Sequence, residues 1–304
     1  MQMVSPELSA AMERLKRKRQ EAGMRDDRFS VAAARAAELE AEPVYPQGMT
    51  FRDVDAGGVA AKWAIPRNGA AARRVVYYHG GGYITGRWET HCTICAWLAE
   101  ASAAPVLFVD YRRAPEHPFP AAVDDAYAAY RWARRNGPGG ASPARSVVTA
   151  GDSSGGALAM AVMLRARSES APMPDAGALI SAMLDLDESS SEFLRTYGRM
   201  RDAARLYVPP PGDPRHEWAS PVHADLAGLP PLLVQTGEAD YVKGDSVLLA
   251  ERARACNLDI RLEVWPEMPH VWHRFAPAVP EARDALDRIG EFLRQQPAFA
   301  GATS

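Results

Sequence analysis

Short apolar runs alternate along most of this chain with longer segments of helical periodicity. The apolar and β-branched runs predict strands at 73–78, 105–110, 146–150, 176–184, 231–236 and 260–265. The segments with helical patterns that follow predict helices at 90–100, 121–134, 154–167, 245–256 and 281–294. Strands that alternate with helices in this way indicate an α/β fold, in which helices cover both faces of a mostly parallel central sheet.

The beginning of the chain has a different pattern. Residues 8–19 and 29–40 have helical periodicity, and two prolines shortly afterwards end the helical pattern. Strand-like runs at 50–55 and 59–65 are separated by a glycine-containing turn, which is typical of a hairpin. Because no strand pattern occurs in residues 1–45, we expect this segment to pack as N-terminal cap helices.

A second irregular segment interrupts the alternation at 185–220. It is rich in Ser, Arg and Pro and carries three consecutive prolines at 209–211. Structureless loops of this length are uncommon within a compact domain, so the segment is interpreted as a cap insertion. The α/β core then comprises residues 46–184 and 221–304.

Composition and charge restrict the classes of partner. The chain has 304 residues, a net charge of −3 and 47% hydrophobic residues, which suffice for a sizeable core. The charge predicts no nucleic-acid partner and no membrane surface partner, and we interpret the basic run at 14–19 as the solvated face of a helix. No run approaches the roughly 20 apolar residues of a membrane span, and the N-terminus lacks a signal-peptide pattern. We therefore expect a soluble, cytoplasmic protein.

The three cysteines are Cys92, Cys95 and Cys256. An odd and sparse count argues against a disulfide framework. Cys92 and Cys95 form a C-x-x-C motif, which occurs in redox sites and in zinc sites. Since there is no second pair and the surrounding segment has helical periodicity, we interpret them as two thiols on the buried face of a helix.

The pentapeptide Gly151-Asp-Ser-Ser-Gly155 lies between a predicted strand and a predicted helix. It matches the G-x-S-x-G pattern, in which small flanking residues allow a sharp turn that exposes the serine hydroxyl. The N-terminus of the following helix favours negative charge, which suits an oxyanion. Ser153 is therefore the candidate nucleophile.

A second motif, His79-Gly-Gly-Gly-Tyr83, directly follows the predicted strand at 73–78. Three glycines leave backbone N–H groups unshielded and free to bind an anion. The segment lacks the lysine and the spacing of a phosphate-binding P-loop. An HGGG segment is the usual oxyanion partner of a G-x-S-x-G serine, and His79 is expected to brace the loop.

A serine nucleophile needs a base, and the base needs an acid that orients it. His270 follows the last predicted strand, where a loop can reach the same edge of the sheet; His273 is the alternative, but its position favours a helical turn. Asp240 follows the strand at 231–236. Glu238 and Asp245 are further candidates for the acid, although Asp245 is expected to cap a helix. The order Ser153, Asp240, His270 is that of an α/β-hydrolase.

Together with Asp110-Tyr-Arg-Arg-Ala-Pro-Glu-His-Pro-Phe-Pro120 and Met268-Pro-His-Val-Trp-His273, these motifs resemble the bacterial hormone-sensitive lipase family of carboxylesterases. The resemblance covers about residues 50–295. It implies the α/β-hydrolase fold with a helical cap, Ser153, Asp240 and His270 as the triad, and backbone donors at Gly81, Gly82 and Ser154. Members usually carry Ala at the position of Ser154. The family also contains dimers paired through the last strand and helix, so a homodimer is one expectation.

The expected activity is the hydrolysis of short- to medium-chain acyl esters through an acyl-enzyme, with a small-molecule ester as substrate. No metal and no organic cofactor is expected. A lactonase, an amidase or a deacetylase on the same scaffold is the alternative. A ligand receptor would be expected to lack part of the triad, and the arginines at 195, 199, 201 and 205 argue against a lid that faces lipid. Tyr83, Trp88 and Leu206 are the candidate substrate-binding residues.

Overall fold

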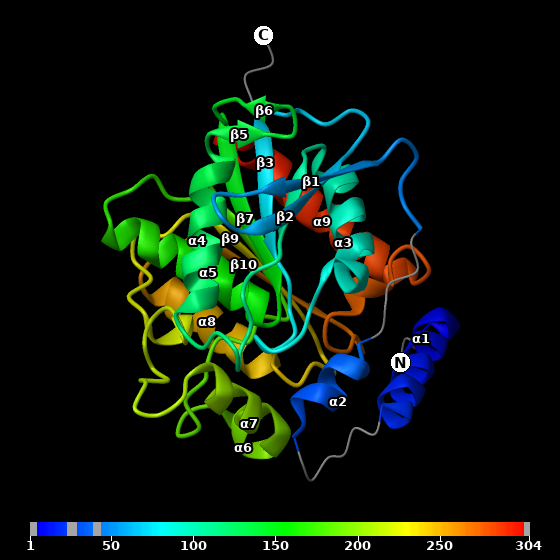
Figure 1. Cartoon of the computed structure of the whole chain (residues 1–304), viewed down its shortest axis with the longest axis vertical. Helices are drawn as coiled ribbons and strands as arrows, with labels where there is room; N and C mark the ends of the chain where they lie inside the picture. Colours follow the sequence, from blue (N-terminus) through cyan, green and yellow to red (C-terminus); the bar gives the residue numbers. More distant parts are fainter. Residues whose placement is uncertain (1–4, 23–28, 39–43, 301–304) are drawn as a thin grey trace.

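A computed structural model of the chain describes residues 5–22, 29–38 and 44–300. An eight-stranded sheet runs through its centre in the order β1-β2-β4-β3-β7-β8-β9-β10 (Figure 1). Strands β4, β3, β7, β8, β9 and β10 are parallel to their neighbours in this series, whereas β2 pairs antiparallel with both β1 and β4. The mostly parallel α/β sheet expected from the sequence is therefore confirmed.

The strands agree closely with the predicted segments. Their bounds are β1 Thr50–Asp55, β2 Ala60–Ile65, β3 Arg73–Tyr78, β4 Val106–Val109, β7 Ser146–Asp152, β8 Gly177–Ile180, β9 Leu232–Gly237 and β10 Ile260–Trp265. Strand β8 is shorter than the predicted segment, which extended to residue 184. A separate two-stranded ribbon, β5 Asn136–Gly137 with β6 Gly140–Ala141, was not predicted, because strands of two residues have no period to detect.

Helices cover both faces of the sheet. One face carries α4 (Ala121–Ala133), α5 (Ser154–Ser168) and α8 (Lys243–Ala255), and the other carries α3 (Trp88–Ser102) and α9 (Pro280–Gln295) (Figure 1). Successive residues of a strand place their side chains in two separate hydrophobic cores, because side chains alternate between the two faces of the sheet. Val76 and Tyr78 enter the first core, whereas Val75 and Tyr77 enter the second. Such doubly covered strands read as continuous apolar runs, which is why the sequence pattern located them.

The cysteines of the C-x-x-C motif behave as expected from the sequence. Cys92 and Cys95 are buried in α3, and Cys95 contributes to the core between this helix and the sheet. All three cysteines carry free thiols. The motif is thus part of the packing between α3 and the sheet.

The two irregular segments of the sequence contain helices. Helices α1 (Pro6–Glu21) and α2 (Val31–Ala36) lie in the first segment, and α6 (Glu192–Thr196) and α7 (Gly198–Tyr207) lie in the second. The predicted helix at 29–40 is shorter than expected, and its last two positions lie outside the described residues. In Figure 1, α6 and α7 lie at the bottom of the molecule, α1 lies on the right-hand side of its lower half, and α2 lies between them.

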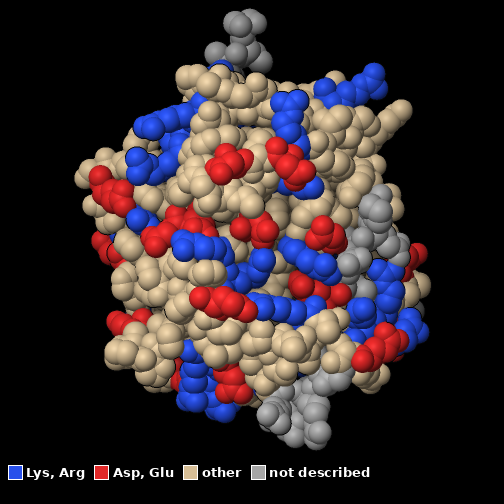
Figure 2. All heavy atoms as spheres, viewed as in Figure 1, with Lys and Arg blue, Asp and Glu red and all other residues tan. Residues whose placement is uncertain are grey.

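The surface carries charges of both signs. On the face seen in Figure 2, basic and acidic side chains are interspersed and are not segregated by sign. None of the helices in the described ranges combines the length and the apolar character needed to cross a bilayer.

Candidate active site

The turn between β7 and α5 places Ser153 at the carboxyl edge of the sheet. Ser153 lies between the last residue of the strand and the first residue of the helix, and its backbone has φ 52° and ψ −121°. A non-glycine residue with positive φ is strained and is held there by the surrounding packing. The helix can approach β3 because residue 155 is glycine: a Cβ at that position would overlap the carbonyl oxygen of Tyr78.

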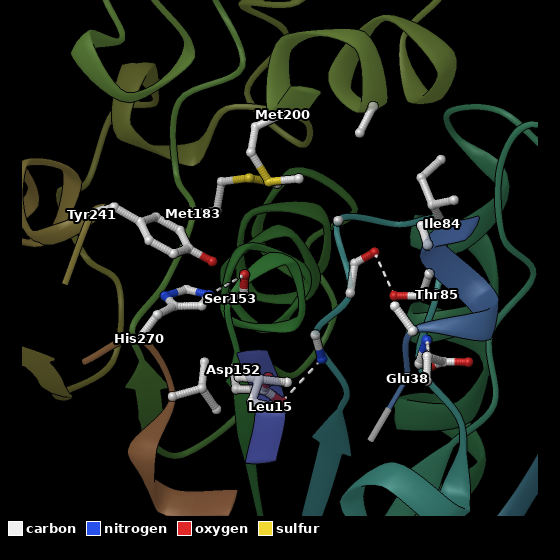
Figure 3. A pocket seen from close by; sticks show the side chains of 18 of the residues that line it. Leu15, Glu38, Ile84, Thr85, Asp152, Ser153, Met183, Met200, Tyr241 and His270 are labelled. Atoms are coloured by element: carbon white, nitrogen blue, oxygen red, sulfur yellow. Dashed lines mark hydrogen bonds between the residues drawn. The ribbon is translucent and has the colours of Figure 1, made fainter. Parts of the chain in front are cut away.

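Three side chains from separate loops meet at this turn. Nε2 of His270 lies 3.0 Å from Oγ of Ser153, and Nδ1 of His270 lies 2.9 Å from Oδ1 of Asp240 (Figure 3). Asp240 follows β9 and His270 follows β10. The carboxyl ends of parallel strands share one edge of the sheet, so residues 87 and 30 positions apart along the chain become neighbours.

Asp240 is held as a carboxylate. Burial alone would disfavour its charge, but the charge and hydrogen bond of His270, the hydroxyl of Ser181 and the N–H of Val242 together lower the pKa of Asp240. The hydroxyl of Thr236 also donates to its Oδ2 at 3.3 Å. Ser181 in turn accepts the N–H of Val271, the residue after His270, at 3.1 Å. Sequence reasoning missed Ser181, which follows a strand but carries no motif.

The alternative candidates for base and acid lie elsewhere. Nε2 of His273 donates to Oε1 of Gln235 at 2.8 Å, and complete burial lowers the pKa of His273 to about 3. It lies on a 3₁₀ turn, Trp272–Phe275, as its position suggested. Glu238 is exposed. Asp245 does not cap α8, contrary to expectation, because the helix begins at Lys243 and the carboxylate accepts N–H groups from Leu184 and Asp185.

The glycine loop after β3 lies against Ser153. Gly81 has a φ of 123°, a conformation that side-chain-bearing residues rarely adopt. Gly81 and Gly82 line the same cavity as Ser153. Among the described residues, no hydrogen bond engages the backbone N–H groups of Gly81, Gly82 or Ser154. Gly81 and Gly82 thus line the cavity of the serine with N–H groups that no described residue engages.

Two buried side chains hold this loop in place. Asp152 accepts the hydroxyl of Tyr77 at 2.6 Å and the N–H of Gly80 at 3.0 Å. Burial disfavours its charge, yet His91, Tyr77 and Gly80 stabilise the anion and lower the pKa of Asp152. The Nδ1 of His79 lies 2.8 Å from the carbonyl oxygen of Gly80, and burial followed by the charge of His91 lowers the pKa of His79 to about 3. His79 therefore braces the loop as a neutral ring.

A cavity of about 430 Å³ opens above Ser153. Its lining comes from the glycine loop, the Ser153 turn, the loops that carry Ala239 to Tyr241 and Pro269 to Val271, and helices α1, α2, α6 and α7. Met183 and Met200 contribute apolar side chains on one side of the hydroxyl in Figure 3. Within the described ranges, no three His, Cys, Asp or Glu side chains gather as ligands for a metal ion.

The three residues expected to bind substrate lie outside the lining of this cavity. Tyr83 is fully buried and stacks on Tyr207 at 3.6 Å between ring centroids. Trp88 makes edge contacts with Phe51 and Phe108 on the α3 side of the sheet. Leu206 packs against the other core, on the side of α4 and α5. Their aromatic or aliphatic character did not reveal which side chains face the cavity.

This geometry is accompanied by similarity to known proteins. The family model described as alpha/beta hydrolase fold matches residues 75–274, which is more than half of the chain. The chain belongs to the α/β-hydrolase family. An acetyl-hydrolase of Streptomyces hygroscopicus is 39% identical to this α/β-hydrolase over 249 residues, which cover 79% of the chain and 81% of the relative. The carboxylesterase NlhH of Mycobacterium tuberculosis is 36% identical over 231 residues, with 70% of both chains covered.

Solved structures place the α/β-hydrolase in a narrower group. An esterase from the bacterial hormone-sensitive lipase family superposes with a TM-score of 0.83 at 35% identity, covering 97% of this chain and 99% of the other. The esterase EstE5, in a crystal soaked with p-nitrophenyl butyrate, superposes with a TM-score of 0.86 at 34% identity, covering 98% and 100%. The resemblance to the hormone-sensitive lipase family that the motifs implied is thus confirmed.

Proposed function

We propose that this α/β-hydrolase is a serine carboxylesterase whose catalytic residues are Ser153, His270 and Asp240. The observation that carries the proposal is the continuous chain of contacts from Ser153 Oγ to His270 Nε2 and from His270 Nδ1 to Asp240 Oδ1, at 3.0 and 2.9 Å. It faces a cavity that Gly81 and Gly82 of the glycine loop also line. This is the arrangement that acyl transfer from an ester requires.

In the proposed reaction, the oxygen of Ser153 attacks the ester carbonyl carbon and its proton passes to Nε2 of His270. The N–H groups of Gly81, Gly82 and Ser154 stabilise the carbonyl oxygen as it becomes negative. The bond from carbon to the alkoxy oxygen then breaks, and the alkoxy oxygen takes the proton from His270. Water repeats the sequence on the acyl-enzyme and restores Ser153.

Asp240 holds the imidazole in the required tautomer and stabilises the imidazolium formed during each proton transfer. Because its pKa is lowered, Asp240 remains ionised well below neutral pH. The proposed base, His270, must be neutral to accept a proton.

The size of the cavity supports short- to medium-chain acyl esters as substrates. A volume of about 430 Å³ lies toward the small end of ligand-binding pockets. Relatives named acetyl-hydrolase, esterase and carboxylesterase support the same class of substrate. Acetyl esters are the first series to measure, since one such relative is an acetyl-hydrolase.

The test is a profile of kcat/KM over p-nitrophenyl esters of increasing acyl length, with Ser153→Ala as the control. The wild type should hydrolyse the short esters, and Ser153→Ala should lower kcat/KM by at least about 10⁴-fold, because the remaining groups cannot form the acyl-enzyme. Parallel assays with lactones, anilides and N-acetyl substrates separate the alternatives of lactonase, amidase and deacetylase. An unchanged rate in a folded Ser153→Ala variant would overturn the proposal.

We also propose that helices α1, α2, α6 and α7 around the cavity, from residues 1–45 and 185–220, form its cap. They contribute Leu15, Ala34, Phe193 and Met200, among others, to the cavity lining. A homodimer through β10 and α9 is a further proposal, supported by the position of β10 at the edge of the sheet, where its outer backbone groups can pair with another strand. Sedimentation analysis would test it.

A cytoplasmic location remains part of the proposal. All three cysteines have free thiols, which fits a reducing compartment. Fractionation of the producing cells would test the location directly.

A further inference from the structure

Tyr241 follows Asp240 in the chain and contributes its ring to the wall of the cavity. Its ring centroid lies 4.2 Å from that of His270, with an angle of 30° between the two planes. Tyr241 therefore packs against the imidazole that also contacts Ser153 and Asp240. No motif of the sequence pointed to this residue, and the mechanism above does not use it.

Besides His270, the ring of Tyr241 contacts aromatic residues in and directly after helix α6. Its ring stacks on Phe193 at a centroid distance of 5.1 Å and a plane angle of 10°, and it contacts Tyr197 at 5.7 Å. Phe193 is 5% exposed and is thus firmly packed. The Tyr241 ring therefore bridges a helix of the proposed cap and the imidazole, and aromatic pairs of this kind add to the stability that burial supplies.

The hydroxyl of Tyr241 has a different environment. Figure 3 shows it directed toward Ser153, on the same side of the serine as His270, whereas the glycine loop lies on the other side. In the described part of the chain, no hydrogen bond engages this hydroxyl. A phenol is a neutral hydrogen-bond donor below its ordinary pKa of about 10. A donor in this position faces the reacting centre.

We propose that Tyr241 has two roles in ester hydrolysis: its ring positions His270, and its hydroxyl donates a hydrogen bond to the alkoxy oxygen of the substrate as that oxygen departs. The inference rests on the proposed function. The glycine loop holds the carbonyl oxygen on one side of Ser153, so the alkoxy oxygen is directed to the His270 side, where the proton must be delivered. His270 transfers that proton, and Tyr241 keeps its own.

The leaving group provides a specific test of the hydroxyl. An alkoxide leaving group develops much more negative charge than p-nitrophenolate, so a hydrogen bond to it matters more for alkyl esters. Tyr241→Phe removes the hydroxyl and keeps the ring. We expect kcat/KM of this variant to fall about tenfold with ethyl acetate and by no more than about twofold with p-nitrophenyl acetate, which has the same acyl group.

The ring is tested with Tyr241→Leu. This variant should lose about tenfold in kcat/KM even with p-nitrophenyl acetate, because His270 loses its aromatic support. Tyr241→Phe keeps the ring and should therefore retain the rate with p-nitrophenyl acetate. If both variants melt within a few degrees of each other, a difference in stability does not explain the difference in rate. Tyr127→Phe is the matched control. Tyr127 lies on α4, outside the cavity lining, and its hydroxyl donates a hydrogen bond to Glu169 at 2.9 Å.

The outcomes separate this inference from the proposed function. If the wild type does not hydrolyse either acetate ester, the proposed function fails. If the wild type does and Tyr241→Phe loses equal factors with both esters, the hydroxyl does not act on the leaving oxygen. If Tyr241→Leu equals the wild type with p-nitrophenyl acetate, the ring does not position His270.

Discussion

Single residues decide the chemistry at this site, and Ser154 illustrates how a side chain and its backbone contribute separately. The proposed oxyanion donor is the N–H group, which any residue other than proline supplies. The side chain has a separate contact, since Oγ of Ser154 accepts the N–H of Tyr83 at 3.3 Å and the residue is fully buried. The hydroxyl thereby connects the start of α5 to the glycine loop.

Ser154→Ala should therefore change activity little. The N–H donor remains, and the lost contact is long, so we expect kcat/KM within about threefold of the wild type and a decrease of about 1 kcal/mol in the free energy of unfolding. Steady-state kinetics and urea denaturation would measure both. A loss of a hundredfold or more in kcat/KM would show that the hydroxyl itself takes part in the reaction.

The sequence-based assignment of single residues had a clear limit. Ser153, Asp240 and His270 were found because each lies in a motif or directly after a predicted strand. The structure brings these three together, and their catalytic roles stay proposals. Trp88 and Leu206 were placed at the pocket by their character alone, and both pack elsewhere, because hydrophobicity does not say which of several apolar environments a side chain enters.

At the scale of elements, the β7–α5 connection depends on close approach of backbones. Gly155 lies in the first turn of α5, where the helix passes over the end of β3. There is no room for a side chain because the neighbour is a carbonyl group of the central sheet, which cannot move aside without disturbing the strand. The glycine of the motif is thus a packing requirement as well as a feature of the turn.

Gly155→Ala should destabilise the protein by about 3 kcal/mol and lower kcat, because α5 and Ser153 must shift away from β3. Thermal unfolding and kinetics would measure both effects. Gly139→Ala is the matched control, since Gly139 lies in the β5–β6 turn, where an added Cβ would meet no other atom within 4 Å. Equal stability of the two variants would contradict this account of the connection.

Element boundaries were predicted well where burial on both faces enforces a pattern. Strands β1, β3 and β10 have the predicted bounds, and α4 and α9 differ by a residue at their ends. Helices α6 and α7 were not predicted individually within 185–220. They have only five and ten residues and lie in a segment rich in Ser, Arg and Pro, a composition that is typical of loops.

At the scale of the whole molecule, one buried carboxylate connects the core to the segment that leads into α6. Oδ2 of Asp245 in α8 accepts the N–H groups of Leu184 at 2.7 Å and Asp185 at 3.2 Å. Burial raises the pKa of Asp245 to about 7. The hydrogen bond from Leu184 lowers this pKa by a smaller amount, and the negative charge of Asp185 raises it further. Below about pH 7, the folded protein therefore favours the protonated form of the Asp245 carboxyl group.

This raised pKa predicts how stability depends on pH. In the unfolded chain Asp245 ionises near its ordinary value of 3.8, whereas in the folded protein it holds its proton to about pH 7. Below pH 3.8 the group is protonated in both states and the folded state has its full stability. Between pH 3.8 and about 7, only the unfolded chain releases the proton, so the free energy of unfolding decreases by roughly 1.4 kcal/mol for each pH unit. The free energy of unfolding should fall over this range relative to Asp245→Asn.

Asp245→Asn provides the comparison because its amide oxygen can accept the same two N–H groups without a titratable proton. Urea denaturation of both proteins at several pH values between about 4 and 8 would give the difference in unfolding free energy. A difference that does not change with pH would contradict the raised pKa of Asp245.

The sequence by itself determined the order of strands and helices along the chain, the turn around Ser153 and the glycine loop. These features depend on local backbone conformation and on the period of apolar residues. Only the tertiary structure decided which side chains surround Ser153. The strand order brings the ends of β3, β7, β8, β9 and β10 to one edge, so Ser181 and Tyr241 join the site without any local signal. Contacts between residues distant in sequence depend on how the sheet is assembled, and that assembly minimises the free energy of the whole chain and not of any one segment.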